Sequence, residues 1–335
     1  LIFPFLQVSG MQLFKLESSD VGDKFSARIA DTARQIMLLY VLLTVLTAVG
    51  LIAVGLKPFD AVCHAMTALS TGGFGTRDSS VGYFGSIAVE AILVVAMIAG
   101  SLTLTLVLRA VAGHPRPLLR DPQTQLFFAV IGIAAIVLTI WRVATSDTLP
   151  GPALWSSVFS VVSIITTTGF VTEDYSTWGA LPVAAFFVIT FMGGCTGSTA
   201  GGLKFYRLYV LLIATANHFR MLLHPHRIAL LRYGDKRLDD EVVRSVTTFV
   251  LLYMASFVVI AGGLSVTGLD LVTSLSGSAQ AIANVGPGLG DIIGPAGNFS
   301  TLSDSAKFIL AAGMLLGRLE IVAVVMVFTP AFWRA

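Results

Sequence analysis

Long apolar runs, separated by short polar or glycine-rich segments, dominate this 335-residue chain. Six of the runs are long enough to cross a bilayer as helices, which takes about 20 residues. They cover residues 36–56, 84–108, 124–145, 180–217 (with an interruption), 243–264 and 305–330. The pattern predicts an all-α integral membrane protein that crosses the membrane several times.

A shorter apolar stretch lies between the two members of each pair of runs, and it is too short to span a bilayer. The three stretches are Phe59–Leu69, Pro152–Ile165 and Leu271–Ala283. A glycine-bearing loop follows each stretch: STGGFGTRD at 70–78, TTTGFVTED at 166–174 and ANVGPGLGD at 283–291. We expect each unit to consist of a membrane helix, a re-entrant pore helix with its loop, and a second membrane helix. Because the same order occurs three times, the chain is predicted to be a domain-scale repeat.

Composition agrees with a membrane location. Hydrophobic residues make up 55% of the chain, charged residues only 12%, and the mean hydropathy is +0.85. Soluble domains carry about 25% charged residues, so lipid is expected around much of this protein. The net charge of +2 is too small to indicate a nucleic-acid partner. The two cysteines, Cys63 and Cys195, are far apart in the chain and predict neither a disulfide framework nor a metal site.

Basic residues gather in the segments that connect the repeats, above all in 204–244, whereas few lie beside the glycine-bearing loops. By the positive-inside rule, the connectors are cytoplasmic and the loops face outward. Carboxylates flank the loops on that outer side, at Asp78, Glu173, Asp174 and Asp291. They either concentrate cations at an entrance by focusing the field or only solvate the loop ends, and both interpretations stay open.

The three loops have the chemistry of a cation filter. A loop at membrane depth leaves carbonyl groups without helical partners, which is tolerated where they line a cavity, and rings of carbonyls replace a cation's hydration shell. Glycine permits the backbone angles that turn successive carbonyls toward one axis. The loop cores contain no acidic side chain, so a monovalent cation is expected rather than Ca²⁺ or Mg²⁺. The predicted filter residues are Ser70, Thr71, Gly72, Gly73, Thr166, Thr167, Thr168, Gly169, Ala283, Asn284, Val285 and Gly286.

Several motifs, spread over nearly the whole chain, carry a specific resemblance. They are SGMQLFKLES at 9–18, the TGGF and TTTGF loops, GGCTGSTAGGLK at 193–204, NVGPGLG at 284–290 and GRLEI at 317–321. Together they resemble the membrane subunit of the Trk/Ktr/HKT superfamily of potassium transporters, and most of all its bacterial TrkH/TrkG branch. The resemblance implies repeated units of membrane helix, pore loop and membrane helix around a central ion pathway, four in the family and three here.

By this resemblance the first repeat is missing, so we expect the sequence to be part of a longer protein. Residues 1–35 then contain the end of a preceding membrane helix and a cytoplasmic connector. The other divisions are the second repeat at 36–112, the third at 113–217, a basic cytoplasmic connector at 218–242 and the fourth repeat at 243–335.

The segment 193–202 interrupts an apolar run with five glycines and several other small residues. Glycine costs about 1 kcal/mol relative to alanine within a helix, so we expect a flexible loop under the filter; a helix-packing seam of small residues is the alternative. The resemblance implies an intramembrane gate at this place. Its predicted residues are Gly193, Gly194, Thr196, Gly197, Ser198, Thr199, Gly201 and Gly202, together with Arg318.

Arg318 is the only basic residue deep in an apolar run. An intramembrane charge is costly and indicates a functional site by default; the alternative is a side chain that extends to the inner surface. Because the guanidinium cannot lose its proton, we expect it to point into the pathway just below the filter, within hydrogen-bonding distance of 193–202. Its charge then opposes the cation until the pore opens.

The resemblance implies potassium uptake across the bacterial cytoplasmic membrane, with K⁺ as the transported ion at the filter residues and no organic cofactor. Sodium-permeable or less selective transport on the same fold, and ion-coupled secondary transport, stay open as alternatives. An enzyme is not expected, because the apolar runs contain no catalytic set such as paired aspartates or a nucleophile with a base. The resemblance implies a homodimer and a cytoplasmic nucleotide-binding regulatory subunit of the TrkA type. The basic connector suits that subunit or anionic lipid headgroups.

Overall fold

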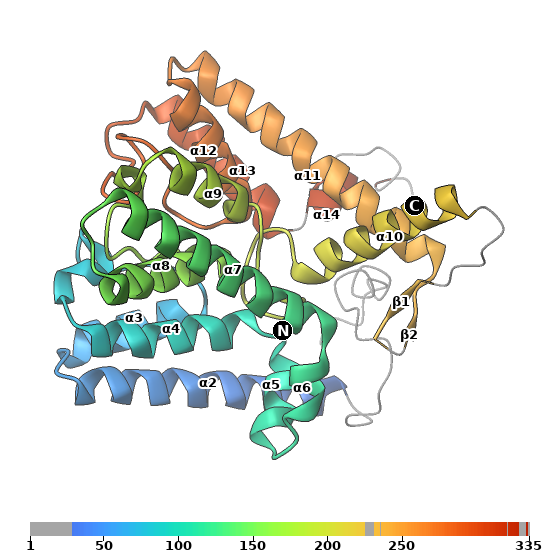
Figure 1. Cartoon of the computed structure of the whole chain (residues 1–335), viewed down its shortest axis with the longest axis horizontal. Helices are drawn as coiled ribbons and strands as arrows, with labels where there is room; N and C mark the ends of the chain where they lie inside the picture. Colours follow the sequence, from blue (N-terminus) through green and yellow to red (C-terminus); the bar gives the residue numbers. More distant parts are fainter. Residues whose placement is uncertain (1–28, 225–230, 235, 320, 328–332, 334–335) are drawn as a thin grey trace.

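The structure, a computed structural model, describes residues 29–224, 231–234, 236–319, 321–327 and 333. Predictions about 1–28, including the end of a preceding membrane helix, lie outside these residues. The prediction of an all-α protein is confirmed: apart from one small hairpin, the regular elements among the described residues are helices. Figure 1 shows most of them running in nearly the same direction, with the glycine-bearing loops gathered at one end of the molecule.

From here on, the three repeats present in the chain are numbered one to three, so that the unit at 36–112, the second by the resemblance, is the first repeat. It is built from residues 29–111. It contains α2 (Ile29–Ala53), α3 (Pro58–Leu69), the 3-10 turn η2 (Ser80–Phe84), α4 (Ile87–Ser101) and α5 (Leu104–Val111). Pro58 occupies the first position of α3, where a missing N–H group costs nothing because helix-start N–H groups have no intrahelical partner. The short helix thus has a defined start after the tight turn that ends α2.

The second and third repeats follow the same order. After α6 (Arg116–Arg120), the second repeat contains α7 (Pro122–Thr145), α8 (Pro150–Ile165), η3 (Tyr175–Trp178), α9 (Ala180–Thr190) and α10 (Phe205–Leu223). An antiparallel hairpin, β1 (Arg232–Tyr233) with β2 (Lys236–Arg237), pairs Arg232 with Arg237. The third repeat contains α11 (Asp240–Val266), α12 (Leu271–Ala283), α13 (Asp304–Arg318) and α14 (Ile321–Val327).

The three predicted pore helices are present as α3, α8 and α12, with starts within two residues of the expected ones and identical ends. Each packs against the first helix of its own repeat. The last ten residues of α8 and all but the first two of α12 are buried or nearly so. The helices α8 and α12 therefore lie in the interior of the described part (Figure 1), whereas α3 keeps an exposed side with Phe59 and Met66.

The first helix of each repeat is a complete membrane span. Among the described residues, three helices are long and apolar enough to cross a bilayer, by length and composition: residues 32–53 of α2, α7 and α11. Their outer faces carry large exposed apolar side chains, such as Leu42 and Leu46 of α2 and Ile140 of α7. In water such faces would be unfavourable, whereas lipid tails suit them.

The second helix of each repeat is broken, which corrects two of the six predicted spans. Residues 84–108 were expected to form one helix, but α4 ends at Ser101 and α5 continues at an angle of 114°. Residues 305–330 were also expected to be continuous, but α13 ends at Arg318 and α14 lies at 106° to it; residues 328–330 lie outside the described part. The predicted interruption of 180–217 is confirmed, between α9 and α10.

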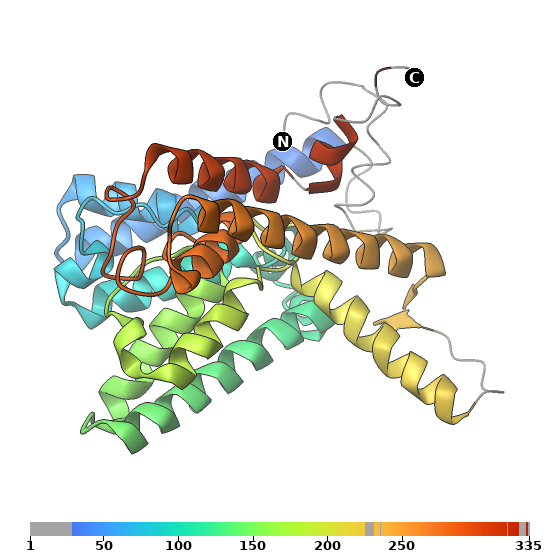
Figure 2. The same ribbon diagram turned by 90° about the horizontal axis from the view of Figure 1, so that it is seen from above.

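The segments that join the repeats lie at the opposite end from the glycine-bearing loops. In Figures 1 and 2, the α5–α6 connection, the end of α10 and the hairpin all lie toward the right, away from the loops. Part of the predicted basic connector 218–242 is helical, because α10 extends to Leu223 and α11 starts at Asp240. Arg227 of this connector lies outside the described residues. The arrangement agrees with the orientation expected from the basic residues.

Candidate ion filter and gate

The three pore helices all present their carboxyl ends to the glycine-bearing loops. α3, α8 and α12 end at Leu69, Ile165 and Ala283, directly before or within the predicted filter residues. A helix carries a partial negative charge at its carboxyl end. Three such ends directed at one region favour a cation there, without any carboxylate side chain.

The chain leaves the three pore helices through the same hydrogen-bonded turn. In the second repeat, the N–H groups of Thr168 and Gly169 both donate to the carbonyl oxygen of Ser163, at 3.0 and 3.1 Å. In the first repeat, the corresponding bonds run from Gly72 and Gly73 to Thr67, at 2.8 and 3.3 Å. The third repeat retains one of them, from Val285 to Gln280 at 3.0 Å. The loops are therefore equivalent in conformation as well as in sequence position.

Two left-handed residues, separated by one residue of negative φ, recur in every loop. The pairs are Thr71 (φ +51°) and Gly73 (+66°), Thr167 (+56°) and Gly169 (+81°), and Asn284 (+57°) and Gly286 (+111°). Left-handed backbone is unfavourable for threonine, and strained residues of this kind cluster at functional sites. The structure thus imposes the same unusual backbone on three loops that differ in side chains.

Neighbouring loops contact one another through their backbones. A Cβ atom on Gly73 would overlap the carbonyl oxygen of Thr168, and one on Gly169 would overlap that of Val285. The first loop therefore packs on the second, and the second on the third. At Gly286, by contrast, no described atom lies within 4 Å of the corresponding Cβ position. The three loops form a consecutive arc around one region.

Side-chain oxygens support the loops from behind. Ser163 Oγ donates to the carbonyl oxygen of Phe170 at 2.7 Å, and Thr67 Oγ1 donates to that of Phe74 at 2.9 Å. Gln280 takes the equivalent place in the third repeat, where its amide is fully buried and makes no hydrogen bond to the described residues. No sequence pattern singles out these three residues, because the role of each depends on a contact with the residue seven positions further along the chain.

The glycine-rich segment forms a non-helical loop between α9 and α10. Its two ends are joined: Gly193 N donates to Leu203 O at 2.9 Å, and Leu203 N donates to Phe191 O at 3.0 Å. A Cβ atom on Gly193 would overlap the carbonyl oxygen of Gly201, so the close approach of the two strands of the loop requires glycine. The alternative of a continuous packing helix is wrong.

This loop contacts all three repeats just below the predicted filter residues. Thr199 Oγ1 donates to the carbonyl oxygen of Leu69, the last residue of α3, at 2.9 Å. Gly201 N donates to Thr167 Oγ1 in the second filter loop at 2.7 Å. On the third side, Gly201 packs against the carbonyl oxygen of Ala283 and the Cβ atom of Asn284. The loop therefore lies against the side of the filter that faces the connectors.

The break between α4 and α5 receives the other side of the loop. Cys195 N donates to Ser101 O at 2.8 Å, and Thr199 N donates to Gly100 O at 3.1 Å. The carbonyl groups that lose their partners where α4 stops are thus satisfied by the loop. Hydropathy could not reveal this break, because the sequence from 101 onward stays apolar; the alternation Ser101, Thr103, Thr105 was its only signal.

Arg318 ends α13, and its side chain is exposed. The preceding Gly317 packs against Ile282 O and the amide of Asn284, which donates to Met314 O at 3.1 Å. Arg318 is therefore one residue from a contact with the third glycine-bearing loop. The expected hydrogen bond to 193–202 does not occur among the described residues.

The outer flank of the second loop contains a half-buried ion pair that no sequence pattern predicts. Arg142, 9% exposed, lies at the end of α7, with Nη2 3.1 Å from Glu173 Oε2. Its Nη1 donates to Ser156 Oγ of α8, and its guanidinium lies 4.0 Å from the ring centroid of Trp178. Glu173 is thus paired with a cation of the same chain although it is exposed, as Asp78 and Asp291 also are.

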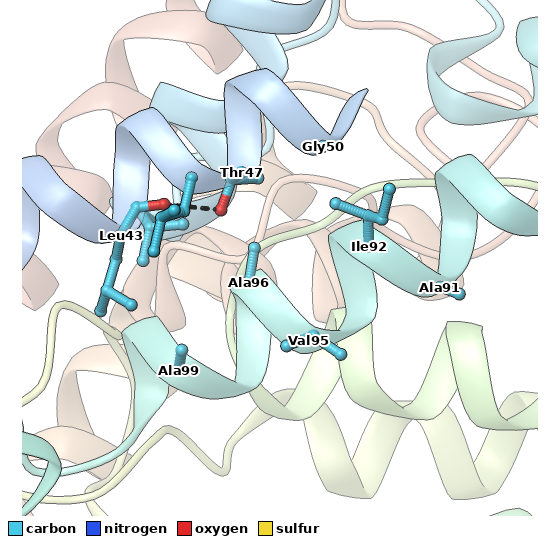
Figure 3. Close-up of a pocket in the computed structure, with 10 residues that line it drawn as sticks. Leu43, Thr47, Gly50, Ala91, Ile92, Val95, Ala96 and Ala99 are labelled. Carbon is cyan, nitrogen blue, oxygen red and sulfur yellow. Dashed lines mark hydrogen bonds between the residues drawn. The ribbon is translucent and has the colours of Figure 1, made fainter. Parts of the chain in front are cut away.

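An apolar groove of about 450 Å³ lies between α2 and α4 (Figure 3). Its lining is almost entirely aliphatic, and its one hydroxyl, on Thr47, donates to the carbonyl oxygen of Leu43 at 2.8 Å. A lining of this kind offers no oxygen ligands to a cation. The groove therefore does not belong to the ion pathway.

The geometry defines a class of protein: a membrane protein in which three short re-entrant helices end at equivalent glycine-bearing loops that pack against one another. A comparison with protein families matches residues 1–334 to TrkH, described as a cation transport protein. The chain belongs to the TrkH family of cation transport proteins.

Individual relatives agree over nearly the whole chain. The Trk system potassium uptake protein TrkI of Halomonas elongata is 44% identical over 337 residues, which cover 99% of this chain and 68% of that protein. The potassium uptake protein TrkH of Vibrio parahaemolyticus is 37% identical over 100% of this chain and 70% of its own length. The crystal structure of the V. parahaemolyticus potassium transporter TrkH superposes with a TM-score of 0.88, at 34% identity, over 97% of this chain and 69% of that one.

Proposed function

We propose that the chain carries K⁺ into the cell through a filter formed by the backbone of the three glycine-bearing loops. The observation that carries this proposal is the threefold repetition of one strained backbone, with left-handed residues at Thr71, Thr167 and Asn284 and at the glycines two positions later. A ring of carbonyls replaces the hydration shell of a monovalent cation. Relatives at 34–44% identity are potassium uptake proteins, which favours K⁺ as the cargo.

The gate in this proposal is the loop 193–202, with Arg318 beside it. The support is the position of the loop: it contacts the end of α3, the second filter loop at Thr167 and the third at Ala283. A loop in that position obstructs a path that leaves the filter toward the connectors. Its non-helical backbone permits movement without unwinding a helix. Arg318 adds a positive charge on the same side.

Sodium-permeable or less selective transport on the same fold is the second candidate. The third loop departs from the other two, since Asn284 and Pro287 stand where the second loop has Thr167 and Phe170. One deviating loop changes the oxygen ligands on one side of the pathway, which lowers discrimination between K⁺ and Na⁺. Ion-coupled secondary transport is less favoured, because all three repeats have the same orientation rather than the inverted arrangement common in such transporters.

The partners in this proposal are a second copy of the chain and a cytoplasmic nucleotide-binding subunit of the TrkA type. The relatives are described as members of a Trk system, which favours a multi-subunit assembly. The exposed Arg232 and Arg237 of the hairpin give the connector end a basic surface suited to such a subunit. Lipid headgroups compete for the same charges.

Uptake by the reconstituted protein tests the function. The purified protein in liposomes should admit ⁸⁶Rb⁺, a K⁺ substitute, and external K⁺ should compete with the tracer far more strongly than Na⁺ does. Equal competition by Na⁺ would support the less selective alternative. Absence of Rb⁺ uptake from liposomes that contain correctly inserted protein would contradict both candidates.

A further inference from the structure

One side chain fastens the glycine-rich loop at a point away from the filter. Gln123, in the first turn of α7, accepts a hydrogen bond from Thr196 N at 3.0 Å through its Oε1. Its Nε2 donates to Thr103 Oγ1 at 3.2 Å, and Thr103 Oγ1 donates in turn to Thr196 O at 2.8 Å. The three residues form a closed ring of hydrogen bonds that joins the loop, the α4–α5 break and the start of α7. We call this set the Gln123 clasp.

The surroundings make the Gln123 clasp effective. Gln123 is 6% exposed, so water does not readily compete for its amide. Hydrogen bonds in a buried network strengthen one another, and an unpaired buried amide is costly. Immediately beside Thr196, Gly197 O accepts from Leu104 N at 3.2 Å. Movement of the loop away from α5 therefore has to break the clasp first.

The same turn of α7 is also joined to the cytoplasmic hairpin. Asp121 caps α7, with Oδ2 accepting from Thr124 N at 3.2 Å, and its Oδ1 accepts from the hydroxyl of Tyr233 at 2.6 Å. Burial, together with this bond to the Asp121 carboxylate, raises the pKa of Tyr233 well above its ordinary value, so the hydroxyl stays a donor. Asp121 and Gln123 are two residues apart on one rigid turn.

We propose that Gln123 is a positioning residue of the gate: it holds the loop in the closed position, and movement of the cytoplasmic hairpin reaches the loop through the Tyr233–Asp121 bond and this clasp. The proposal deepens the proposed function and rests on it, because a closed position has meaning only if 193–202 blocks an ion path. Gln123 itself contacts no filter residue in the bonds described. It acts through the loop and through Thr103.

A native cysteine reports the position of the loop without any transport measurement. Cys195, next to Thr196, is fully buried, so a charged thiol reagent reaches it only when the loop opens locally. In a Cys63→Ala background, we expect Gln123→Met to speed the modification of Cys195 in the purified protein by about tenfold, since two hydrogen bonds of the closed state are lost. Methionine keeps the length and approximate volume of the side chain.

Matched variants distinguish the clasp from general loosening. Gln125→Met changes the same residue type two positions later, where the exposed Gln125 amide donates only to Leu119 O at 3.0 Å, and it should leave the modification rate unchanged. Thr103→Val, at the start of α5, breaks two of the three bonds of the ring, the one from Gln123 Nε2 and the one to Thr196 O, and should speed the modification to a similar extent. The double variant should add little, because the two residues act in one network.

Flux provides the second measurement. In liposomes, Gln123→Met and Thr103→Val should raise Rb⁺ uptake several-fold while the preference for K⁺ over Na⁺ stays the same, since the filter is untouched. Unchanged Cys195 modification in both variants would overturn the proposal, and so would an equal acceleration by Gln125→Met. If the wild-type protein shows no uptake, the proposed function fails, but the thiol measurement still decides whether the clasp holds the loop.

Discussion

At the scale of single residues, the left-handed threonines are the most informative feature of the filter. A left-handed conformation costs a residue with a branched Cβ about 1–3 kcal/mol, yet Thr71 and Thr167 adopt it. Thr167 gains a compensating contact, because its hydroxyl accepts from Gly201 N of the loop at 2.7 Å. A glycine in that place would relieve the strain but would lose the bond. The side chain therefore joins the filter to the loop beneath it.

Gly169 tests the importance of the filter backbone. A Cβ atom there would overlap the Val285 carbonyl oxygen, and a serine would have to adopt the φ of +81° that Gly169 has. Gly169→Ser should therefore displace the carbonyls of two neighbouring loops. We expect the K⁺/Na⁺ preference to fall at least several-fold, measured by competition with Rb⁺ uptake. Gly132→Ser is the control, because no described atom lies within 4 Å of its Cβ position in α7. Full selectivity in the Gly169 variant would exclude these carbonyls from the filter.

Arg142 tests whether the outer flank of the second loop is held by its ion pair. Arg142→Met would leave Glu173 without its cation and Ser156 without a donor. The cost should lie between the ~1 kcal/mol of an exposed pair and the ~3–5 kcal/mol of a buried one, since the Glu173 side chain is 46% exposed. We expect a lower thermal midpoint in detergent and reduced K⁺ preference. Lys307→Met, which breaks the exposed pair with Asp304, should change neither the thermal midpoint nor the K⁺ preference. Equal effects of Arg142→Met and Lys307→Met would contradict the role of Arg142 in holding the outer flank.

At the scale of elements, the two long helices within each repeat differ from each other. α2, α7 and α11 are continuous, whereas the helices after the loops are broken at 101–104, 190–205 and 318–321. The first of these breaks supplies the freed carbonyl groups of Gly100 and Ser101, which the glycine-rich loop pairs with. The second break is the glycine-rich loop itself.

The pore helices could be predicted from the sequence because they follow from length alone: a dozen apolar residues between a proline or aspartate and a glycine-bearing loop. The break at Ser101 could not be predicted, because it depends on hydrogen bonds from Cys195 and Thr199, almost a hundred residues later. Gln123 was missed for the same reason, since one glutamine in an amphipathic helix start carries no signal. The glycines of 193–202 were recognised because their composition is incompatible with a lipid-facing helix.

Arg318 belongs to this scale because its effect depends on where α13 ends. If its guanidinium lies beside the path below the filter, a charge ~6 Å from the cation at an effective dielectric of ~20 raises the barrier by about 3 kcal/mol, roughly a hundredfold in rate. The Arg318 side chain is exposed and makes no hydrogen bond to the described residues of 193–202, so pore water screens part of the repulsion between its charge and the cation. We therefore expect Arg318→Ala to raise Rb⁺ uptake by about tenfold or more at unchanged K⁺ preference, and Arg318→Lys to restore most of the barrier. An alanine variant with unaltered uptake would place the side chain outside the path.

At the scale of the whole molecule, the hairpin and the end of α10 lie away from the pore helices α3, α8 and α12 (Figure 1), so the control that we propose for a cytoplasmic partner has to cross the distance between them. The hairpin provides a route, since Tyr206 and Tyr209 of α10 pack against Tyr233, with ring centroids 5.1 and 5.4 Å apart. Tyr233 in turn bonds to Asp121 at the start of α7. A force on the hairpin is therefore passed to two helices that flank the loop.

The exposed charges of the hairpin provide the test of a docked regulatory subunit. Reversal of both Arg232 and Arg237 to glutamate should weaken binding of an acidic partner surface, since electrostatic complementarity sets association, while both residues are too exposed for the change to disturb the fold. The purified nucleotide-binding subunit is added to liposomes of neutral lipid that contain either protein. We expect nucleotide to change Rb⁺ uptake by the wild type, and this change to disappear in the double variant. Neutral lipid removes headgroup binding as an explanation.

Lys57, exposed between α2 and α3, provides the matched control, because Lys57→Glu reverses a charge outside the connectors and outside the glycine-bearing loops. Basal uptake should be equal in the wild type and in both variants, since none of the three changed residues lies in a glycine-bearing loop or in 193–202. Nucleotide control that survives the double reversal would move the docking surface to the connector 109–123 or to the residues beyond Pro330. Tyr233→Phe keeps the ring packing and removes only the hydrogen bond to Asp121. If this variant still binds the subunit but loses nucleotide control of uptake, the bond transmits the signal and is not needed for docking.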